Sequence, residues 1–313
     1  MILITGATGF VGKSLVRCLL ADYVSRRLVI ADRRSGQSWP ERVKSIVTGD
    51  LNHTTDWSIA LEEVAVVVHS AARVHVMHDT EADPLTAFRV VNVGGTLNLA
   101  RQSAAAGVKR FVFISSIGVN GSQTVGGIPF NEAVQTKPHN AYALSKWEAE
   151  EGLMGIAAET KLEVVIIRPP LVYGCKAPGN FGSLTRAVQR GWPLPLGAVH
   201  NQRSLIGLDN LVDFIVNCTT HPQAANQTFL VSDGQDLSTT ELVRGMALAA
   251  GVPARLLPVP VWALQAGASL LGKGDTVERL CGNLQVDISK ARSLLGWLPP
   301  VSVQEGLRRA MAV

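Results

Sequence analysis

Short apolar runs alternate with longer segments in which apolar residues recur every three or four positions. Several runs are apolar throughout and rich in β-branched residues, which is typical of strands buried on both faces. The runs predict strands at Ile2–Thr5, Leu28–Ala31, Ser45–Val47, Val64–His69, Arg110–Ser115 and Leu162–Ile167. The segments between them predict helices at Gly12–Ala21, Pro84–Ala106 and Ala141–Ala158. Repeated β-α-β units with right-handed crossovers predict an α/β chain with a doubly wound parallel sheet of the Rossmann type.

The pattern changes in the second half of the chain. Glycine and proline interrupt the segments LVYGCKAPGNFG and RGWPLPLG, and shorter helices are predicted at Thr239–Ala250 and Val303–Met311. We therefore expect a dinucleotide-binding domain over residues 1–170, with later strands of its sheet contributed from about residues 200–235. Residues 171–313 are expected to form mainly a smaller C-terminal α/β lobe that binds substrate.

The longest apolar stretch runs from Val261 to Leu271 and is interrupted by polar residues and glycine. It is too short to span a bilayer, so we expect a partly buried helix of the second lobe and no membrane insertion. The N-terminal MILIT is a strand without a preceding basic region or cleavage site. This start predicts no signal peptide and a cytoplasmic location.

Composition narrows the class of protein further. Of 313 residues, 47% are apolar and 17% are charged, which favours a folded chain with a sizeable core. The net charge of +4 is mild and its basic residues are scattered, so no nucleic-acid partner is expected. Neither the four cysteines nor the seven histidines have metal-ligand spacing, so no metal site is expected.

A glycine-rich turn, TGATGFVG, places Gly6, Gly9 and Gly12 between the first strand and the first helix. Glycines let the backbone approach a pyrophosphate, and the helix N-terminus offers free N–H groups and a partial positive charge. The turn therefore predicts a dinucleotide site. We include Thr8, Phe10 and Val11 in it.

Asp32 ends the second strand, about 20 residues after the glycine turn, as expected for the acid that binds the adenosine ribose. A carboxylate there accepts hydrogen bonds from the 2′- and 3′-hydroxyls of NAD and repels the 2′-phosphate of NADP. Arg33 and Arg34 follow and could hold that phosphate, so NAD is favoured and NADP stays possible. The residues after the third and fourth strands complete the predicted site: Asp50, Leu51, Ser70, Ala71 and Ala72.

Tyr142 and Lys146 form a Y-x-x-x-K pair on one side of a predicted helix. A free tyrosine titrates near ~10, and a nearby ammonium together with an oxidised nicotinamide favours its phenolate. Tyr142 could then exchange a proton with a substrate hydroxyl while hydride moves to or from the nicotinamide. Ser116, after the strand Arg110–Ser115, could donate a hydrogen bond to the reacting oxygen, with Ser115 as the neighbouring alternative.

These motifs resemble the extended short-chain dehydrogenase/reductase family, and within it the NAD-dependent nucleotide-sugar epimerase/dehydratase branch that contains UDP-galactose 4-epimerase. The resemblance covers nearly the whole chain and rests on TGATGFVG, NVGGTLNLA, FISSIGVNG, YALSK, RPPLVYG, RSLIGLDNL and DISKARSLLGW. It implies that Ser116, Tyr142 and Lys146 are the catalytic triad and that Tyr142 and Lys146 also contact the cofactor. It also assigns Asn92 and Pro169 to the cofactor region.

The resemblance further implies that Arg203, and with it Arg279, binds the diphosphate of the substrate. Two arginines on one pyrophosphate would anchor it through charged bidentate bonds. Dehydratases of this branch carry an Asp-Glu pair where this chain has Ile117 and Gly118, so sugar dehydration is not expected. Leu171 stands where relatives often have a substrate-binding asparagine, so their substrate contacts do not carry over directly.

The expected function is hydride transfer at C4 of a UDP-sugar in bacterial surface-polysaccharide synthesis. Two reactions fit, namely a UDP-N-acetylhexosamine 4-epimerase and a UDP-4-keto-6-deoxy-N-acetylhexosamine 4-reductase. The alternatives are a reductase of a non-nucleotide carbonyl on the same fold and a dinucleotide-sensing protein without catalysis. The resemblance also implies a homodimer, in which the helices Pro84–Ala106 and Ala141–Ala158 of two chains form a four-helix bundle.

Overall fold

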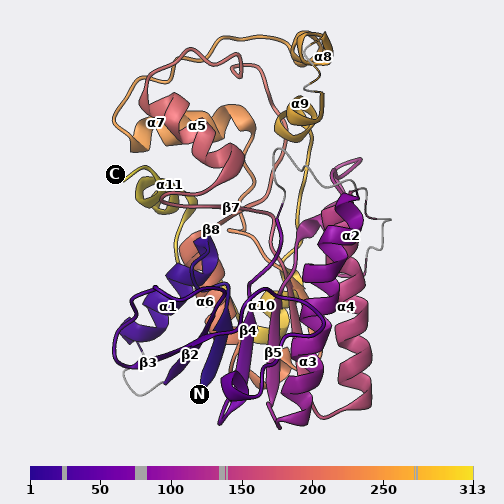
Figure 1. Cartoon of the computed structure of the whole chain (residues 1–313). Helices are drawn as coiled ribbons and strands as arrows, with labels where there is room; N and C mark the ends of the chain where they lie inside the picture. The colour runs from indigo at the N-terminus through magenta and orange to yellow at the C-terminus, as the bar shows by residue number, and fades with distance from the viewer. Residues whose placement is uncertain are drawn as a thin grey trace.

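A computed structural model describes residues 1–22, 27–74, 83–133, 138, 140–270, 272 and 274–312. Within these residues, seven strands form one parallel sheet, the lower part of the molecule in Figure 1. The strands are β1 (Ile2–Thr5), β2 (Leu28–Asp32), β3 (Val43–Val47), β4 (Val66–His69), β5 (Arg110–Ile114), β6 (Glu163–Arg168) and β9 (Gln227–Leu230). Their order is β3-β2-β1-β4-β5-β6-β9, which reverses between β1 and β4. The predicted doubly wound sheet is confirmed, and the reversal marks the edge where such sheets bind ligands.

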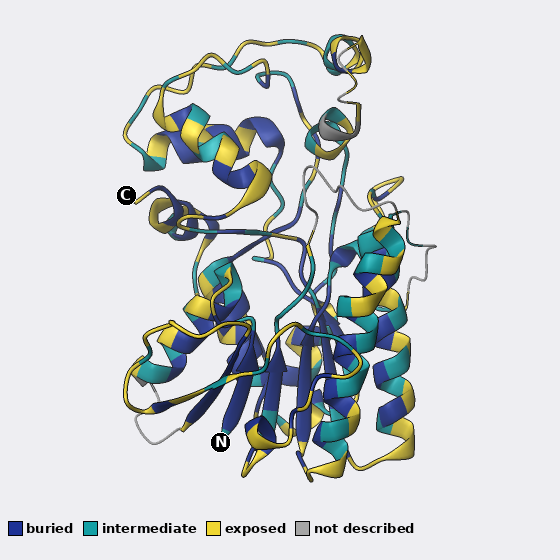
Figure 2. Cartoon of the chain, in the orientation of Figure 1, coloured by how far each residue is buried: buried dark blue, intermediate teal, exposed yellow. Residues whose placement is uncertain are grey.

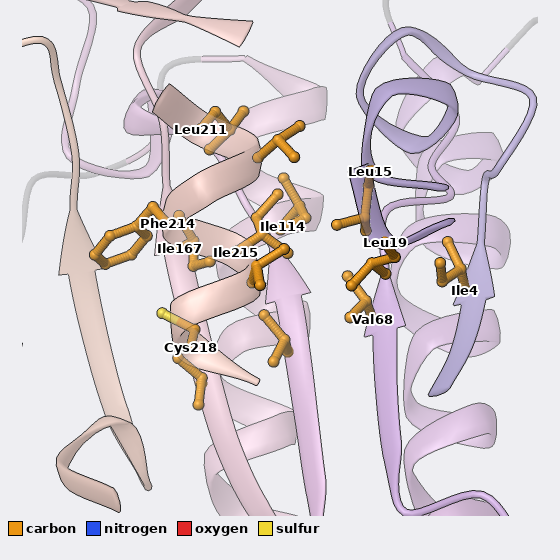
Figure 3. Packing of buried hydrophobic residues seen from close by; sticks show 14 of the residues in the cluster. Ile4, Leu15, Leu19, Val68, Ile114, Ile167, Leu211, Phe214, Ile215 and Cys218 are labelled. Carbon is orange, nitrogen blue, oxygen red and sulfur yellow. The ribbon is translucent and has the colours of Figure 1, made fainter. Parts of the chain in front are cut away.

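Helices cover both faces of the sheet. The helical segments of this domain are α1 (Phe10–Asp22), η1 (Ile59–Leu61), α2 (Pro84–Phe88), η2 (Arg89–Gly95), α3 (Thr96–Ala105), η3 (Ile117–Val119), α4 (Ala141–Glu159), α6 (Leu208–Cys218), η4 (Pro222–Ala224) and α10 (Ser289–Leu295). Leu15 and Leu19 of α1 and Phe214 of α6 pack on one face (Figure 3). Leu99 of α3 and Leu153 of α4 pack on the other face.

Alternation along each strand explains why the runs are apolar throughout. In β1, Ile4 points to the layer of α1 and α6, whereas Leu3 points to the layer of α3 and α4. The same division separates Val68 from Val67 in β4. Since the side chains of the central strands are buried against one helix layer or the other, those strands have few polar residues, which lie mainly at their ends, whereas the edge strand β3 exposes Lys44 and Ser45.

The predicted helix Pro84–Ala106 is not α-helical in its middle part. Helix α2 continues into α3 through the π-helical segment η2, so the chain is helical but its hydrogen-bond spacing changes. A Cβ on Gly95 would lie 2.5 Å from Cγ of Leu51, so this backbone packs directly on the segment that follows β3. Such π segments within helices are frequent at functional sites, and this one contributes Val90 and Val91 to the cavity described below.

The remaining elements form a smaller lobe above the sheet in Figure 1. They are β7 (Leu171–Tyr173), α5 (Gly179–Gln189), β8 (Leu205–Gly207), α7 (Thr239–Ala249), α8 (Val261–Leu270), α9 (Gly274–Cys281) and α11 (Val303–Met311). Phe181, Met246 and Leu307 belong to its separate apolar core. Of the strands in the 200–235 region, β9 joins the main sheet, whereas β8 pairs in parallel with β7.

Helix α8 forms where the apolar stretch predicted a helix. Val261 and Leu264 pack against the core of the lobe, so the helix is partly buried. Trp262 and Leu270 remain 72% and 89% exposed. In the part of the chain that the structure describes, no helix has the length and apolar character required to cross a membrane.

Candidate active site

The turn between β1 and α1 can be built only with glycine at two positions. Gly6 has a φ of +71°, and a Cβ on it would lie 2.7 Å from the backbone nitrogen of Ala71. A Cβ on Gly12 would lie 2.1 Å from the carbonyl oxygen of Gly6. The turn therefore closes tightly against the loop after β4, and bare backbone N–H groups at the start of α1 face whatever binds there.

A cavity of about 900 Å³ extends from this turn over the carboxyl ends of β1, β2 and β4. Most of the predicted cofactor residues line it, namely Gly6, Thr8, Gly9, Phe10, Val11, Gly12, Asp32, Arg33, Asp50, Leu51, Ser70, Ala71 and Ala72. The volume and the mixed apolar and polar lining fit a dinucleotide. Within the described residues, no group of His, Cys, Asp and Glu side chains is arranged to hold a metal ion.

Other lining residues were missed from the sequence. They are Thr48, Asn52, Trp57, Arg73, Val74, Val90, Val91 and Pro178, among others. Thr48, Arg73 and Val74 lie just beyond strands that end at this edge, so counting every residue after each strand would have found them. Pro178 comes from the lobe, and no local pattern in the sequence indicates that it reaches the cavity.

Two hydrogen bonds hold the side chain of Asp32 in place beside the cavity. Its carboxylate is 4% exposed and accepts hydrogen bonds from Nε1 of Trp39 and Oγ of Ser45, both at 2.8 Å. Arg33 lies 3.9 Å from the carboxylate of Asp50, and both side chains are largely exposed. A buried carboxylate at the end of β2 suits the two ribose hydroxyls of NAD, which is the chemistry that Asp32 predicts.

Tyr142 and Lys146 are positioned by the start of α4. The Asn140 side chain caps the helix by accepting a hydrogen bond from the N–H of Ala143 at 2.8 Å. One turn after Tyr142, Nζ of Lys146 donates to the carbonyl of Ile114 at 2.8 Å. Lys146 is 2% exposed, and its ammonium lies 4.3 Å from the centroid of the Phe113 ring. The lysine therefore joins α4 to the end of β5, just before Ser116.

The loop after β5 lies against the same helix start. A Cβ on Gly118 would lie 3.3 Å from Cβ of Ala143, the residue after Tyr142. Oγ of Ser116 accepts the N–H of Gly118 at 3.1 Å and so caps η3. Ser116, Tyr142 and Lys146, which the sequence singled out separately, thus come from two elements that are in contact.

The structure separates Ser116 from its neighbour Ser115. The Ser115 hydroxyl donates to the carboxylate of Glu150, which is 2% exposed and also pairs with Arg168. That hydroxyl is therefore used inside the protein. Ser116 is half-buried, and its oxygen accepts a backbone hydrogen bond, which leaves its proton available to a substrate oxygen. Ser116 is the better candidate of the two.

Burial controls the protonation of the candidate catalytic pair. It raises the pKa of Tyr142 to about 12 and lowers the pKa of Lys146 to about 7, and the carboxylate of Glu150 partly opposes the shift of Lys146. The Phe88 ring meets Tyr142 edge-on at 5.9 Å. In these surroundings the phenol stays protonated at neutral pH, so forming the phenolate requires further positive charge beside it, such as an oxidised nicotinamide would carry.

Asn92 and Pro169 support the site without lining the cavity. Asn92 is 1% exposed, and its Nδ2 donates at 3.0 Å both to Oγ of Ser145 in α4 and to the carbonyl of Arg73. Its Oδ1 accepts the N–H of Arg73 at 2.8 Å. The carbonyl of Pro169 accepts the N–H of Ile117 at 2.9 Å. Both residues therefore fix backbone segments that surround the candidate catalytic residues.

Arg203 and Arg279 lie near the same end of α9. NH1 of Arg203 donates to the carbonyl of Gly282 at 2.9 Å, and burial lowers the pKa of its guanidinium. Among the described residues, no carboxylate forms an ion pair with Arg203. Arg279 lies exposed in the last turn of α9. A half-buried guanidinium without a carboxylate partner among the described residues is well suited to an anionic group of a ligand.

His69, at the end of β4, should make the fold sensitive to acid. It is buried between Thr5 and Thr96, whose hydroxyls lie 2.7 and 2.9 Å from its ring nitrogens. Burial, with the nearby Lys146, lowers its pKa to about 3. Because the unfolded chain binds a proton near pH ~6.5 and the folded chain does not, stability should fall by about 1.4 kcal/mol per pH unit as the pH drops from there towards ~3.

The measurement is the free energy of urea unfolding between pH 7 and 4, for the wild type and His69→Gln. The amide keeps partners for both hydroxyls but does not titrate, so its curve should be flatter at acid pH. The matched control is the exposed His200→Gln, which should keep the wild-type slope. Parallel curves for the wild type and His69→Gln would contradict the prediction.

The amino-acid sequence matches the NAD dependent epimerase/dehydratase family over residues 2–232, which include the whole candidate site except the arginine of α9. The chain belongs to this family. The predicted resemblance is therefore confirmed, and so is the prediction of an NAD-dependent enzyme of the extended short-chain dehydrogenase type. NAD is the cofactor that the glycine turn and Asp32 of this family member fit.

Individual relatives are similar over their whole length. The chain is 49% identical to a protein of Vibrio cholerae named UDP-glucose 4-epimerase, with 98% of this chain and 93% of the relative covered. It is 28% identical to the N-acetyl-alpha-D-glucosaminyl-diphospho-ditrans,octacis-undecaprenol 4-epimerase of Escherichia coli O157:H7, with 99% and 94% covered. A solved UDP-glucuronic acid 4-epimerase of Bacillus cereus in complex with NAD shares the fold, with a TM-score of 0.79, 21% identity and 99% and 94% coverage.

Proposed function

We propose that the protein is a UDP-sugar 4-epimerase that interconverts UDP-glucose and UDP-galactose. The observation that carries the proposal is the 49% identity, over nearly the whole of both chains, to the relative named UDP-glucose 4-epimerase. The contact between the loop of Ser116 and the start of α4 supports it, because that contact joins the two elements that carry a hydroxyl, a phenol and an ammonium, although none of the three residues lines the cofactor cavity.

The chain's own residues would handle the C4 oxygen and its proton. Ser116 donates a hydrogen bond to the C4 oxygen, and Tyr142 takes the proton of the C4 hydroxyl. Bound NAD supplies reversible hydride transfer at C4. The resulting 4-keto sugar rotates in the site and presents its opposite face. Tyr142 then returns the proton, and the C4 configuration is inverted. Lys146, anchored on the carbonyl of Ile114, holds the positive charge that the phenolate needs.

The sugar is the finer part of the proposal. The relative at 49% identity favours glucose and galactose. The relative at 28% identity acts at C4 of an N-acetylglucosaminyl group, so UDP-N-acetylhexosamines are the second candidate substrate. The 4-ketoreductase reaction would use the same three residues, but the names of both relatives favour epimerisation.

The experiment offers the purified protein UDP-glucose, UDP-galactose and UDP-N-acetylglucosamine in separate reactions, without added reductant, and separates the products by chromatography. A further reaction contains a UDP-4-keto sugar with NADH or NADPH. We expect the C4 epimer from at least the glucose pair. Turnover only in the reaction with reductant would show that the protein is a 4-ketoreductase and not an epimerase. No turnover in any reaction would contradict C4 chemistry.

Arg203 distinguishes a nucleotide substrate from a carbonyl compound without a diphosphate. Losing its charged hydrogen bonds to a diphosphate, worth about 1.5–3 kcal/mol, should raise KM about 10- to 100-fold in Arg203→Met, with a smaller effect on kcat. The control is Arg244→Met, an exposed arginine of α7. Binding of UDP alone, measured by calorimetry, should weaken in parallel. Unchanged KM and UDP binding in Arg203→Met would remove this arginine from the substrate site.

Two further parts of the proposal concern assembly and location. We propose a cytoplasmic homodimer in which η2, α3 and α4 pair with the same helices of a second copy. Trp147 of α4, which is 37% exposed, is an apolar residue available for that contact. Light scattering of the purified protein measures the mass that decides between monomer and dimer.

A further inference from the structure

Two neighbouring segments of the lobe expose large apolar side chains. They are residues 190–197 and residues 254–260, and they are joined by backbone hydrogen bonds. The N–H of Leu194 donates to the carbonyl of Arg255 at 2.9 Å, and the N–H of Leu257 donates to the carbonyl of Leu194 at 2.8 Å. The second segment leads directly into α8. We define the outer patch as the exposed apolar and basic residues of these two segments and of α8, namely Arg190, Trp192, Arg255, Leu257, Trp262 and Leu270.

The apolar members of this patch are more exposed than a core requires. Trp192 is 55%, Leu257 50%, Trp262 72% and Leu270 89% exposed. Helix α8 has no charged residue, and Ala268 is its one buried residue. Figures 1 and 2 place α8 at the end of the molecule farthest from the sheet, with most of its surface exposed. Two exposed tryptophans and two exposed leucines on α8 and the two segments beside it in the lobe are unusual for a surface that faces only water.

The charged residues of the outer patch itself are all cations, whereas the neighbouring helix α9, which packs against α8, carries Asp275 and Glu278. The sequence contains no Asp or Glu between Glu163 and Asp209, and none between Glu241 and Asp275. These two stretches supply the whole patch. Arg190 and Arg255 are exposed, and the guanidinium of Arg190 lies 5.5 Å from the centroid of the Trp192 ring. The apolar side chains are thus accompanied by cations without neighbouring carboxylates in the sequence.

The combination of exposed apolar side chains and arginines favours some binding partners of the outer patch over others. A second copy that docked through the same patch would add its own Arg190 and Arg255 to an interface whose patch residues include no carboxylate, and like charges within an interface are costly. A bilayer with anionic lipids offers the opposite charge and an apolar interior at one surface. Tryptophan favours the level of the lipid headgroups, and arginine is attracted to anionic ones.

We propose that the outer patch docks the protein on the surface of an anionic phospholipid bilayer. Helix α8 lies in the plane of the headgroups and inserts Trp262 and Leu270 among the upper parts of the acyl chains, as amphipathic and apolar surface helices do. Arg190 and Arg255 contact lipid phosphates. The candidate catalytic residues lie on the sheet domain, outside the patch, so docking leaves the cofactor cavity outside the contact.

The test is co-sedimentation with vesicles of phosphatidylglycerol and phosphatidylcholine, compared with vesicles of phosphatidylcholine alone. We expect binding to the anionic vesicles, a blue shift of tryptophan fluorescence on binding, and weaker binding as salt is raised. The double variant Trp262→Ser with Leu270→Ser should bind at least ten-fold more weakly. Arg190→Gln with Arg255→Gln should remove the preference for the anionic vesicles.

Ile59→Ser is the matched control, because it removes an exposed apolar side chain from η1 of the sheet domain, outside the patch, and should leave vesicle binding unchanged. Circular dichroism and thermal unfolding establish that each variant is folded. Failure of the wild type to bind anionic vesicles overturns the proposal, as does undiminished binding by the folded Trp262→Ser, Leu270→Ser variant. A third outcome is that the double variant has a lower molecular mass in solution than the wild type and that neither protein binds vesicles. In that case a second copy covers the patch, and the proposal is wrong.

Discussion

Tyr142→Phe is expected to lower epimerase turnover by about 10²- to 10⁴-fold while NAD remains bound, because the variant loses only the group that exchanges the C4 proton. The ring itself keeps its place. Its edge-on contact with Phe88 does not involve the hydroxyl, and the cap by Asn140 fixes the backbone of α4. Turnover is measured with the substrate that the wild type accepts, and bound cofactor is measured after denaturing the purified protein.

The matched control is Tyr173→Phe. The hydroxyl of Tyr173 donates to the carboxylate of Asp233 at 2.7 Å, and Tyr173 does not line the cofactor cavity. Removing it leaves a buried carboxylate with one donor fewer, so this variant should lose stability and keep most of its turnover. Near-normal turnover in Tyr142→Phe, or an equal loss in both variants, would contradict the proton-transfer role of Tyr142.

The sequence predicted best those elements whose residue pattern depends only on neighbours in the chain. The runs in β1 and β4 are apolar throughout because their side chains meet a helix layer on each face. The glycine turn is readable because steric limits at Gly6 and Gly12 allow no other residue. Ser116, Tyr142 and Lys146 could be proposed from the sequence because strand ends and helix spacing are also local properties.

The rest depends on contacts between distant parts of the chain. The choice of Ser116 over Ser115 follows from a carboxylate on α4, which no periodicity links to β5. Pro178 reaches the cofactor cavity only because the lobe folds over the turn. The sequence predicted α8 as a helix but did not indicate that Trp262 and Leu270 would face outward, since that depends on how α8 sits against the rest of the lobe.

Glu150→Ala should destabilise the fold by about 3–5 kcal/mol, because it leaves the guanidinium of Arg168 buried without its anion. The Glu150 and Arg168 side chains are 2% and 11% exposed and lie 2.5 Å apart. Glu150 also accepts the hydroxyl of Ser115, and Arg168 donates to Oδ1 of Asn120 at 3.0 Å. The pair therefore joins α4, the end of β5, the end of β6 and the loop that follows Ser116.

The free energy of unfolding, measured by urea denaturation, tests this prediction against the matched variant Glu148→Ala. Glu148 is on the same helix and pairs with Arg89, but the two side chains are 22% and 47% exposed, so water can solvate the arginine that is left behind. That variant should lose at most about 1 kcal/mol. The double variant Glu150→Ala with Arg168→Met should recover part of the loss, since no charge remains buried. Equal losses of unfolding free energy in the two single variants would mean that Arg168 reaches water once Glu150 is gone. The pair would then not hold the loop of Ser116 against α4.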